Sequence, residues 1–168
     1  MVRSWLCVAA LLSMSSSAAA QTHVRFVEGR AGANLVGNTY RVRQERATTG
    51  AGISGGMFLS AFWMTEVEYW VRSSSPECCT GLEQLLSVNA ARFYTPGRIR
   101  PYLAGGVAVL RTTGVEQTAA SKLHLQVQVT AGVRLPLGAR LALDVDLRGN
   151  GGGSTMIVRP TVGAAYFF

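Results

Sequence analysis

The sequence has no apolar run that approaches the ~20 residues needed to cross a bilayer as a helix. Charges are also scarce, because Asp, Glu, Lys and Arg make up only 15% of the 168 residues whereas 48% are hydrophobic. Intrinsically disordered chains have low hydrophobicity and high charge, so this composition excludes intrinsic disorder. The absence of a G-x-y or heptad period excludes collagen and coiled coils. A chain of this length supports a single core, so we expect one domain.

The N-terminus has the pattern of a secretory signal peptide over Met1–Ala20. Arg3 supplies the positive charge, Trp5–Leu12 the apolar segment, and an A-x-A sequence the cleavage site. An uncleaved anchor helix is the alternative, but the apolar segment is too short for one. A lipoprotein is disfavoured because Cys7 lies inside the apolar segment. We therefore expect a mature domain over residues 21–168, with its formal net charge lowered from +7 to +6 by the loss of Arg3.

Apolar residues in the mature chain recur at every second position, which is the period of a β-strand. In Lys122–Leu135 the odd positions are all apolar and the even positions are all polar or glycine. The strands are long for a soluble sheet and match the ~9–11 tilted residues that cross a bilayer. The pattern predicts eight strands, at about Thr22–Ala31, Thr49–Phe58, Ala61–Arg72, Leu82–Tyr94, Ile99–Arg111, Lys122–Leu135, Ala139–Arg148 and Met156–Phe168.

The predicted connections alternate in length. Those after the second, fourth and sixth strands are short, and the aromatic residues gather near them and near the C-terminus. Those after the other strands are longer, at about Gly32–Thr48, Ser73–Gly81, Thr112–Ser121 and Gly149–Thr155. Long loops on one side, tight turns on the other and aromatic belts are typical of an all-β, eight-stranded antiparallel up-and-down transmembrane β-barrel.

By this pattern the chain resembles the small eight-stranded outer-membrane β-barrel family, the OmpA-like transmembrane barrel domain. The stretches Arg100–Val109, Gly132–Arg148 and Arg159–Phe168 carry the resemblance. It implies localisation in the outer membrane of a Gram-negative-type bacterium, with lipids and lipopolysaccharide as surroundings. It also implies a C-terminal assembly signal that the outer-membrane assembly machinery reads transiently, at Val162, Ala164, Tyr166 and Phe168. No peptidoglycan-binding domain follows, so we expect no tether to the cell wall.

An eight-stranded barrel is just wide enough for side chains to fill its interior. The polar strand faces should then form a packed lumen, in which opposite charges pair because an isolated buried charge costs several kcal/mol. A gate, in which exchanged Arg–Asp partners admit ions, is the alternative, and we expect at most small conductance. The charge network predicted for the lumen comprises Glu66, Glu68, Arg72, Glu83, Arg134, Arg140, Asp144, Asp146, Arg148 and Arg159, with Asn89, His124, Gln126 and Gln128 beside it.

A lipid-modifying enzyme is a less favoured alternative. Ser87, His124, Asp144 and Glu83 supply the residue types of a Ser/His/acid arrangement. However, His124 shares its predicted face with lumen glutamines, and no G-x-S-x-G signature is present. We therefore expect no enzymatic activity.

Metal or cofactor binding has little support, because His23 and His124 are isolated. Cys78 and Cys79 are adjacent in a predicted outer loop of an oxidising compartment. A strained vicinal disulfide, pairing with another chain and free thiols all remain open, and capture of a soft metal is less favoured. We expect no cofactor.

Two further segments, a glycine-rich one and a basic one, could be either ordinary loops or binding sites. Asn150–Ser154 (NGGGS) could suggest a phosphate-binding loop, but no helix follows, so a hairpin loop is favoured. The first long loop is basic and is either simply solvated or in contact with lipopolysaccharide, since guanidinium groups pair well with phosphate. Its candidate contact residues are Arg30, Arg41, Arg43 and Arg46. The arginines match no DNA- or RNA-binding motif, so we expect no nucleic-acid partner.

These patterns together predict an integral outer-membrane protein, monomeric, with a structural or surface-interaction role. The alternative is a secreted, soluble, lipocalin-like barrel that binds a small apolar ligand. The two hypotheses differ in facing, because a soluble barrel would point its apolar residues inward and its polar residues outward.

Overall fold

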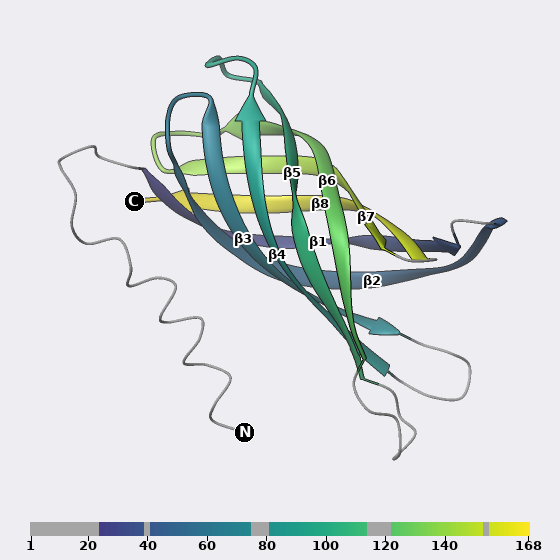
Figure 1. Cartoon of the computed structure of the whole chain (residues 1–168). Coiled ribbons are helices and arrows are strands. Elements are labelled where there is room, and N and C mark those ends of the chain that lie inside the picture. Colours follow the sequence, from purple (N-terminus) through teal and green to yellow (C-terminus); the bar gives the residue numbers. More distant parts are fainter. Residues whose placement is uncertain (1–23, 39–40, 75–80, 114–121, 153–154) are drawn as a thin grey trace, which may run out of the picture.

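A computed structural model of the chain is a closed barrel of eight antiparallel strands, each hydrogen-bonded to its neighbours in sequence (Figure 1). The structure describes residues 24–38, 41–74, 81–113, 122–152 and 155–168, with the backbone alone at 36–38, 41–47, 74, 81, 122 and 155. No helix in these ranges is long and apolar enough to cross a membrane. The strands are β1 (Arg25–Asn38), β2 (Arg41–Phe58), β3 (Trp63–Ser74), β4 (Gly81–Phe93), β5 (Arg100–Thr113), β6 (Lys122–Pro136), β7 (Leu141–Gly152) and β8 (Thr155–Phe167).

The barrel closes between the first and last strands. β1 pairs with β8 from Phe26 opposite Phe167 to Asn38 opposite Thr155. At the end of this seam the Arg25 amide donates to the Phe168 carbonyl at 3.2 Å, and the Phe168 amide donates to the Arg25 carbonyl at 3.0 Å. Among the described strands, closure leaves none at a free sheet edge, which is the condition for a sheet to lie in lipid.

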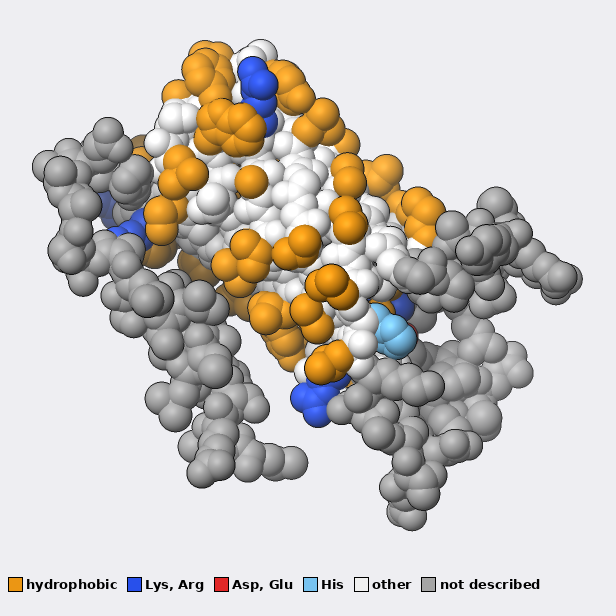
Figure 2. Space-filling model, viewed as in Figure 1, with side chains coloured by type: hydrophobic (Ala, Val, Ile, Leu, Met, Phe, Trp, Pro, Cys, Tyr) orange, Lys and Arg blue, Asp and Glu red, His pale blue; other side chains and the backbone are white. Residues whose placement is uncertain are grey.

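The outer surface is apolar and the inner surface is polar along each strand. In β6, for example, Leu125 is 74% exposed and Val127 62%, whereas Gln126 and Gln128 between them are buried. Figure 2 shows hydrophobic side chains spread over the visible face of the barrel. In β5, whose facing was ambiguous in the sequence, Leu103, Val107 and Val109 point outward, while Tyr102, Ala108 and Leu110 point inward. This facing is opposite to the one that the soluble-barrel alternative requires.

All three short connections, 59–62, 94–99 and 137–140, lie at one end of the barrel, which we call the turn end (Figure 1). The opposite end, where β1 meets β2 and β7 meets β8, is called the loop end. The turns are held by backbone hydrogen bonds, such as the 2.9 Å bond from the Leu59 amide to the Trp63 carbonyl and the 2.8 Å bond from the Leu137 amide to the Leu141 carbonyl.

The eight predicted strands and the barrel fold are confirmed, but two of the predicted long loops are wrong. The segment Gly32–Thr48 is almost wholly strand, because β1 runs to Asn38 and β2 starts at Arg41. Its mixed residues erase the apolar–polar alternation, yet the backbone pairing continues. Asn34 is buried and its amide group donates to the Thr48 carbonyl at 3.2 Å, so this residue lies in the barrel interior.

The second corrected loop is Gly149–Thr155, in which β7 continues through Gly152. The side chain of Asn150, at the start of the NGGGS segment, is buried and donates to Gln128 Oε1 at 3.1 Å. The predicted signal peptide Met1–Ala20, His23 and the pair Cys78 and Cys79 lie outside the described residues.

The interior of the barrel is divided into three layers. Aromatic rings fill the turn end, where Phe58 and Phe93 have centroids 5.5 Å apart and Phe93 and Tyr102 have centroids 5.2 Å apart. At the loop end a second apolar cluster surrounds Trp70. Between these two layers lie most of the buried charged side chains, so this charged layer is capped by apolar groups towards both ends. Arg72 and Glu83 form a separate pair on the loop side of the Trp70 cluster.

Candidate functional site

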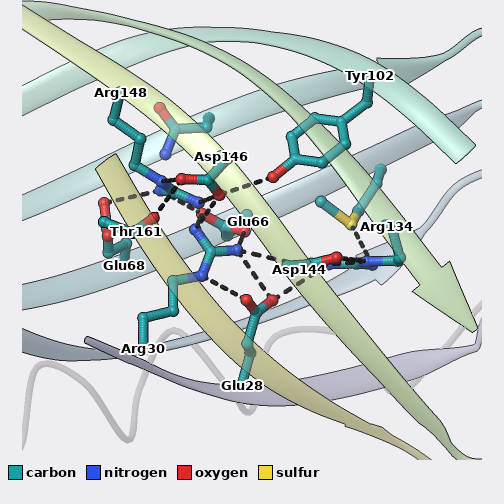
Figure 3. A network of polar contacts seen from close by, with 12 residues as sticks. Glu28, Arg30, Glu66, Glu68, Tyr102, Arg134, Asp144, Asp146, Arg148 and Thr161 are labelled. Atoms are coloured by element: carbon teal, nitrogen blue, oxygen red, sulfur yellow. Dashed lines mark hydrogen bonds and ion pairs between the residues drawn. The ribbon is translucent and has the colours of Figure 1, made fainter. Parts of the chain in front are cut away.

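The charged layer of the lumen is the most distinctive chemical feature of the described structure. Buried carboxylates and guanidinium groups alternate with strand periodicity on β1, β3, β6, β7 and β8, so their side chains converge on the barrel axis (Figure 3). The buried acids are Glu28, Glu66, Glu68, Asp144 and Asp146, and the buried bases are Arg30, Arg72, Arg134, Arg148 and Arg159.

Arg30 lies at the centre of this layer and contacts acids from three strands (Figure 3). Its Nε is 2.6 Å from Glu28 Oε1, and its Nη2 is 2.8 Å from Glu66 Oε2 on β3. Its Nη1 is 3.4 Å from Asp146 Oδ2 on β7. One guanidinium group therefore links strands on opposite sides of the barrel.

Arg134 joins the charged layer to the aromatic layer at the turn end. Its Nε donates to Asp144 Oδ1 at 2.8 Å, and its Nη2 donates to Glu28 Oε2 at 3.1 Å. The guanidinium carbon also lies 5.0 Å from the ring centroid of Phe26 and 5.6 Å from that of Phe93. Ion pairs and cation–π contacts thus hold the same side chain from two directions.

Arg148 and Arg159 extend the network towards the loop end. Arg148 Nη1 is 2.9 Å from both Glu66 Oε1 and Glu68 Oε2. Arg159 Nη2 is 3.2 Å from Glu68 Oε2, and its guanidinium carbon lies 4.8 Å from the Trp70 ring centroid. Glu68 therefore accepts from two arginines, and the network ends against the second apolar cluster.

Neutral side chains complete the coordination of the acids. The Tyr102 hydroxyl donates to Asp146 Oδ2 at 2.7 Å, and the Thr161 hydroxyl donates to Asp146 Oδ1. Gly163 on β8 faces the same layer, and a Cβ there would collide with Glu28 Oε1 and lie 2.7 Å from Arg30 Cγ. The glycine therefore leaves the space that the Glu28–Arg30 pair occupies.

The geometry makes the network a plug. Taking a charge out of water costs several kcal/mol, and each central arginine offsets this by bonding two or more carboxylates. A cavity of about 10 Å³ remains beside Trp70, Arg72 and Arg159, which is space for about one water molecule. The charged side chains therefore fill the middle of the described barrel interior.

The structure places most of the residues predicted for the lumen in this network. Glu83 is half-buried at its edge, where its Oε2 accepts from Arg72 Nε at 2.6 Å. Asn89, Gln126 and Gln128 are also buried, but the assignment of His124 to the lumen is wrong, because it is exposed near the loop end of β6. Residues of the predicted network that lie in the lumen are Glu66, Glu68, Arg72, Glu83, Arg134, Asp144, Asp146, Arg148 and Arg159.

The assignment of Arg140 to the lumen is wrong. β7 begins at Leu141, so Arg140 lies in the turn before it and its side chain is exposed. Its Nη1 lies 3.3 Å from the hydroxyl of Tyr166, a residue of the outer face of β8. Strand alternation was extended two residues too far, into a turn where it no longer determines facing.

The assignment of Arg30 to a lipopolysaccharide-binding loop is also wrong, because Arg30 is 5% exposed and lies at the centre of the lumen. Its partner Glu28 was not predicted either. Glu28 and Arg30 are two and four residues after the buried Phe26, so strand alternation places all three on the same face. This spacing is the signal that could have placed them inside. Arg41, Arg43 and Arg46 belong to β2, and their side chains are not among those described.

The residue types considered for catalysis do not form a triad in the described structure. The buried Ser87 hydroxyl donates to Glu68 Oε2 at 3.2 Å and accepts from Asn89, whereas His124 is exposed. Within the described ranges, no group of three or more His, Cys, Asp or Glu residues is arranged to hold a metal ion. The four residues of the predicted assembly signal, Val162, Ala164, Tyr166 and Phe168, all point outward at the turn end of β8.

No family model and no curated protein matches the sequence. Solved structures do match the fold. Neisserial surface protein A has a TM-score of 0.73 at 15% identity, over 86% of this chain and 97% of that one. The N-terminal β-barrel domain of Pseudomonas aeruginosa OprF has a TM-score of 0.63 at 20% identity, over 85% and 97%.

A third match is Ail, the attachment invasion locus protein of Yersinia pestis, in complex with the heparin analogue sucrose octasulfate. It has a TM-score of 0.60 at 12% identity, over 87% of this chain and 98% of that one. The chain has the fold of the small eight-stranded outer-membrane barrels. This confirms the resemblance at the level of fold, and the fold alone decides no activity, since the outer membrane enzyme PagL shares it with a TM-score of 0.52.

Proposed function

We propose that this chain is a monomeric integral outer-membrane protein with a structural or surface-interaction role. The observation that carries the proposal is the facing of the barrel, with an apolar exterior and a charged, plugged interior. Such an exterior is stable in hydrocarbon, and burial of the charges among themselves keeps them away from lipid. Export through the signal peptide Met1–Ala20 and assembly through the C-terminal strand belong to the same proposal.

Fractionation of expressing cells tests this proposal. The protein should partition with outer membranes and migrate differently on gels before and after heating, because a folded barrel resists detergent until it is boiled. A mature protein that stays in solution without detergent would overturn the proposal in favour of a soluble barrel.

The plugged lumen favours a role at the surface over transport. The cavity beside Trp70 has room for about one water, and charged side chains fill the middle of the barrel, so this described part of the interior favours neither a solute path nor a pocket for an apolar ligand. Interactions are then left to the two ends of the barrel, and the basic segment of β2 with Arg41, Arg43 and Arg46 lies at the loop end. We infer contact of this segment with the phosphate groups of lipopolysaccharide, and no enzymatic activity.

A further inference from the structure

At the rim of the turn end, the exposed charged side chains that the structure describes are all of one sign. Every acid whose side chain the structure describes lies in the lumen, and residues 21–23 before β1 contain no acid. Figure 2 shows a basic side chain among hydrophobic ones at this end, at the top of the view, and no acidic side chain on the visible face. The exposed charges of the described rim are Arg25, Arg92, Arg98 and Arg140, which we call the arginine collar.

Arg92 is the member of the collar that lies deepest in the apolar belt. It faces outward on β4, in the same row as Leu86 and Val88, which are 45% and 53% exposed. Its guanidinium carbon lies 5.8 Å from the ring centroid of Trp63 and 5.9 Å from that of Tyr94. No carboxylate among the described residues pairs with it. An exposed cation without a carboxylate partner is available to bind an anion from outside the chain.

Arg140 contacts a different aromatic residue on another side of the barrel, through a hydrogen bond to its hydroxyl group. Its Nη1 lies 3.3 Å from the Tyr166 hydroxyl, and Tyr166 is itself 42% exposed on the outer face of β8. Both arginines therefore stand beside aromatic rings, which mark the depth of the boundary between hydrocarbon and water. This is the depth of lipid phosphate groups.

The geometry points to a phospholipid site, and we propose that Arg92 and Arg140 each bind the phosphate of an anionic phospholipid in the leaflet at the turn end. At Arg92 the rings of Trp63 and Tyr94 contact the guanidinium group and leave its N–H groups available for bidentate bonds to phosphate oxygens. At Arg140 the hydrogen bond from Nη1 to the Tyr166 hydroxyl orients the guanidinium group, and its other N–H groups can bond the phosphate. A phosphatidylglycerol headgroup suits the collar better than a zwitterionic one, because no headgroup amine competes with the arginines. This inference rests on the proposed insertion of the barrel into a membrane.

Native mass spectrometry of the refolded mature chain in detergent micelles tests the inference. Phosphatidylglycerol and phosphatidylcholine of equal chain length are offered together, and the ratio of bound lipids is measured. We expect preferential binding of phosphatidylglycerol, reduced about fivefold by Arg92→Gln or by Arg140→Gln, the change that corresponds to ~1 kcal/mol per arginine. Arg92→Lys should retain only part of the preference, since lysine keeps the charge and loses the bidentate geometry.

Arg111→Gln is the matched control, because Arg111 is an exposed, outward-facing arginine of β5 at the loop end. It should leave the lipid ratio unchanged. Equal binding of the two lipids by the wild type, or an equal loss in the Arg111 variant, would overturn the inference. Preferential binding of soluble peptidoglycan fragments would overturn it in favour of a cell-wall partner.

Folding is scored first, by heat-modifiable migration in the same micelles. If the chain folds in micelles but does not prefer phosphatidylglycerol over phosphatidylcholine, the phospholipid site alone is overturned. A chain that folds only without detergent overturns the proposed function together with this inference.

Discussion

Arg134 of β6 donates to Glu28 of β1 across the lumen at 3.1 Å, although the two residues are 106 positions apart in the sequence. The contact is one side of a ring of four charges, because Arg134 also bonds Asp144, Glu28 also bonds Arg30, and Arg30 Nη2 lies 3.8 Å from Asp144 Oδ2. It exists only when β1 has closed onto β8. The charged layer is therefore formed by the closed barrel and, once formed, holds its two halves together.

Replacement of Arg134 by methionine tests the strength of this layer. The variant leaves Glu28 and Asp144 buried without their shared partner, and we expect a loss of ~3–5 kcal/mol in the free energy of unfolding. Urea unfolding in micelles, followed by tryptophan fluorescence, measures it. Arg98→Met, at an exposed turn position, should change the value by less than ~0.5 kcal/mol.

A double variant separates lost pairing from lost packing. In Arg134→Met, Glu28 and Asp144 have both lost their bond to Arg134. Adding Glu28→Gln neutralises one of these two carboxylates, so part of the lost free energy of unfolding should return. Losses that simply add would show that the two residues act independently and would contradict the network.

Gly163 should tolerate no side chain. Gly163→Ala brings a Cβ against Glu28 Oε1 and within 2.7 Å of Arg30 Cγ, so we expect a destabilisation of ~1–3 kcal/mol in the same unfolding assay. Gly105→Ala on β5 is the control, since a Cβ there meets no atom within 4 Å. Equal urea unfolding midpoints for Gly163→Ala and Gly105→Ala would show that the space left by Gly163 beside Glu28 does not stabilise the barrel.

Planar-bilayer recording should show only small, irregular conductance for the wild type, because the lumen is plugged. Arg30→Ala removes the central guanidinium and leaves Glu28, Glu66 and Asp146 facing vacated space, so conductance should rise and favour cations. Arg72→Ala, which removes a pair at the edge of the layer, should change it less. Large, stable steps from the wild type would refute the plug.

The C-terminal strand gives a prediction in cells. Phe168 is 67% exposed, and its amide donates to the Arg25 carbonyl at 3.0 Å in the closing seam. Phe168→Ala should keep this backbone bond and still lower the amount of protein recovered in outer membranes severalfold, because the resemblance makes Phe168 part of an assembly signal. Leu137→Ala, a similarly exposed residue of a turn, should have no such effect. Equal recovery of both variants would remove Phe168 from the signal.

Facing could be predicted from the sequence wherever one side of a strand is uniformly apolar, as in Lys122–Leu135. It failed where both sides carry polar residues or glycine. Arg30 illustrates this, since it lies near the end of the predicted strand Thr22–Ala31 and was grouped with the basic residues of the segment that follows. In the structure Asn34 pairs with Thr48, so the strand continues beyond Arg30. The partners of each lumen charge depend on contacts across the barrel, which alternation along a single strand does not contain. Arg140 shows the same limit at a strand end, where a two-residue error in the boundary changed its assigned environment.

The central claim is that the apolar exterior faces lipid, and nitroxide labels on the outer face test it most directly. Labels are placed at Leu125, Val127 and Val129 of β6, all highly exposed, with Arg98 as a turn-end reference. In protein reconstituted into phospholipid vesicles, the labels on β6 should collide mainly with oxygen, which concentrates in hydrocarbon, and the label at Arg98 mainly with a water-soluble nickel chelate. Frequent collisions of the β6 labels with the nickel chelate would contradict the account.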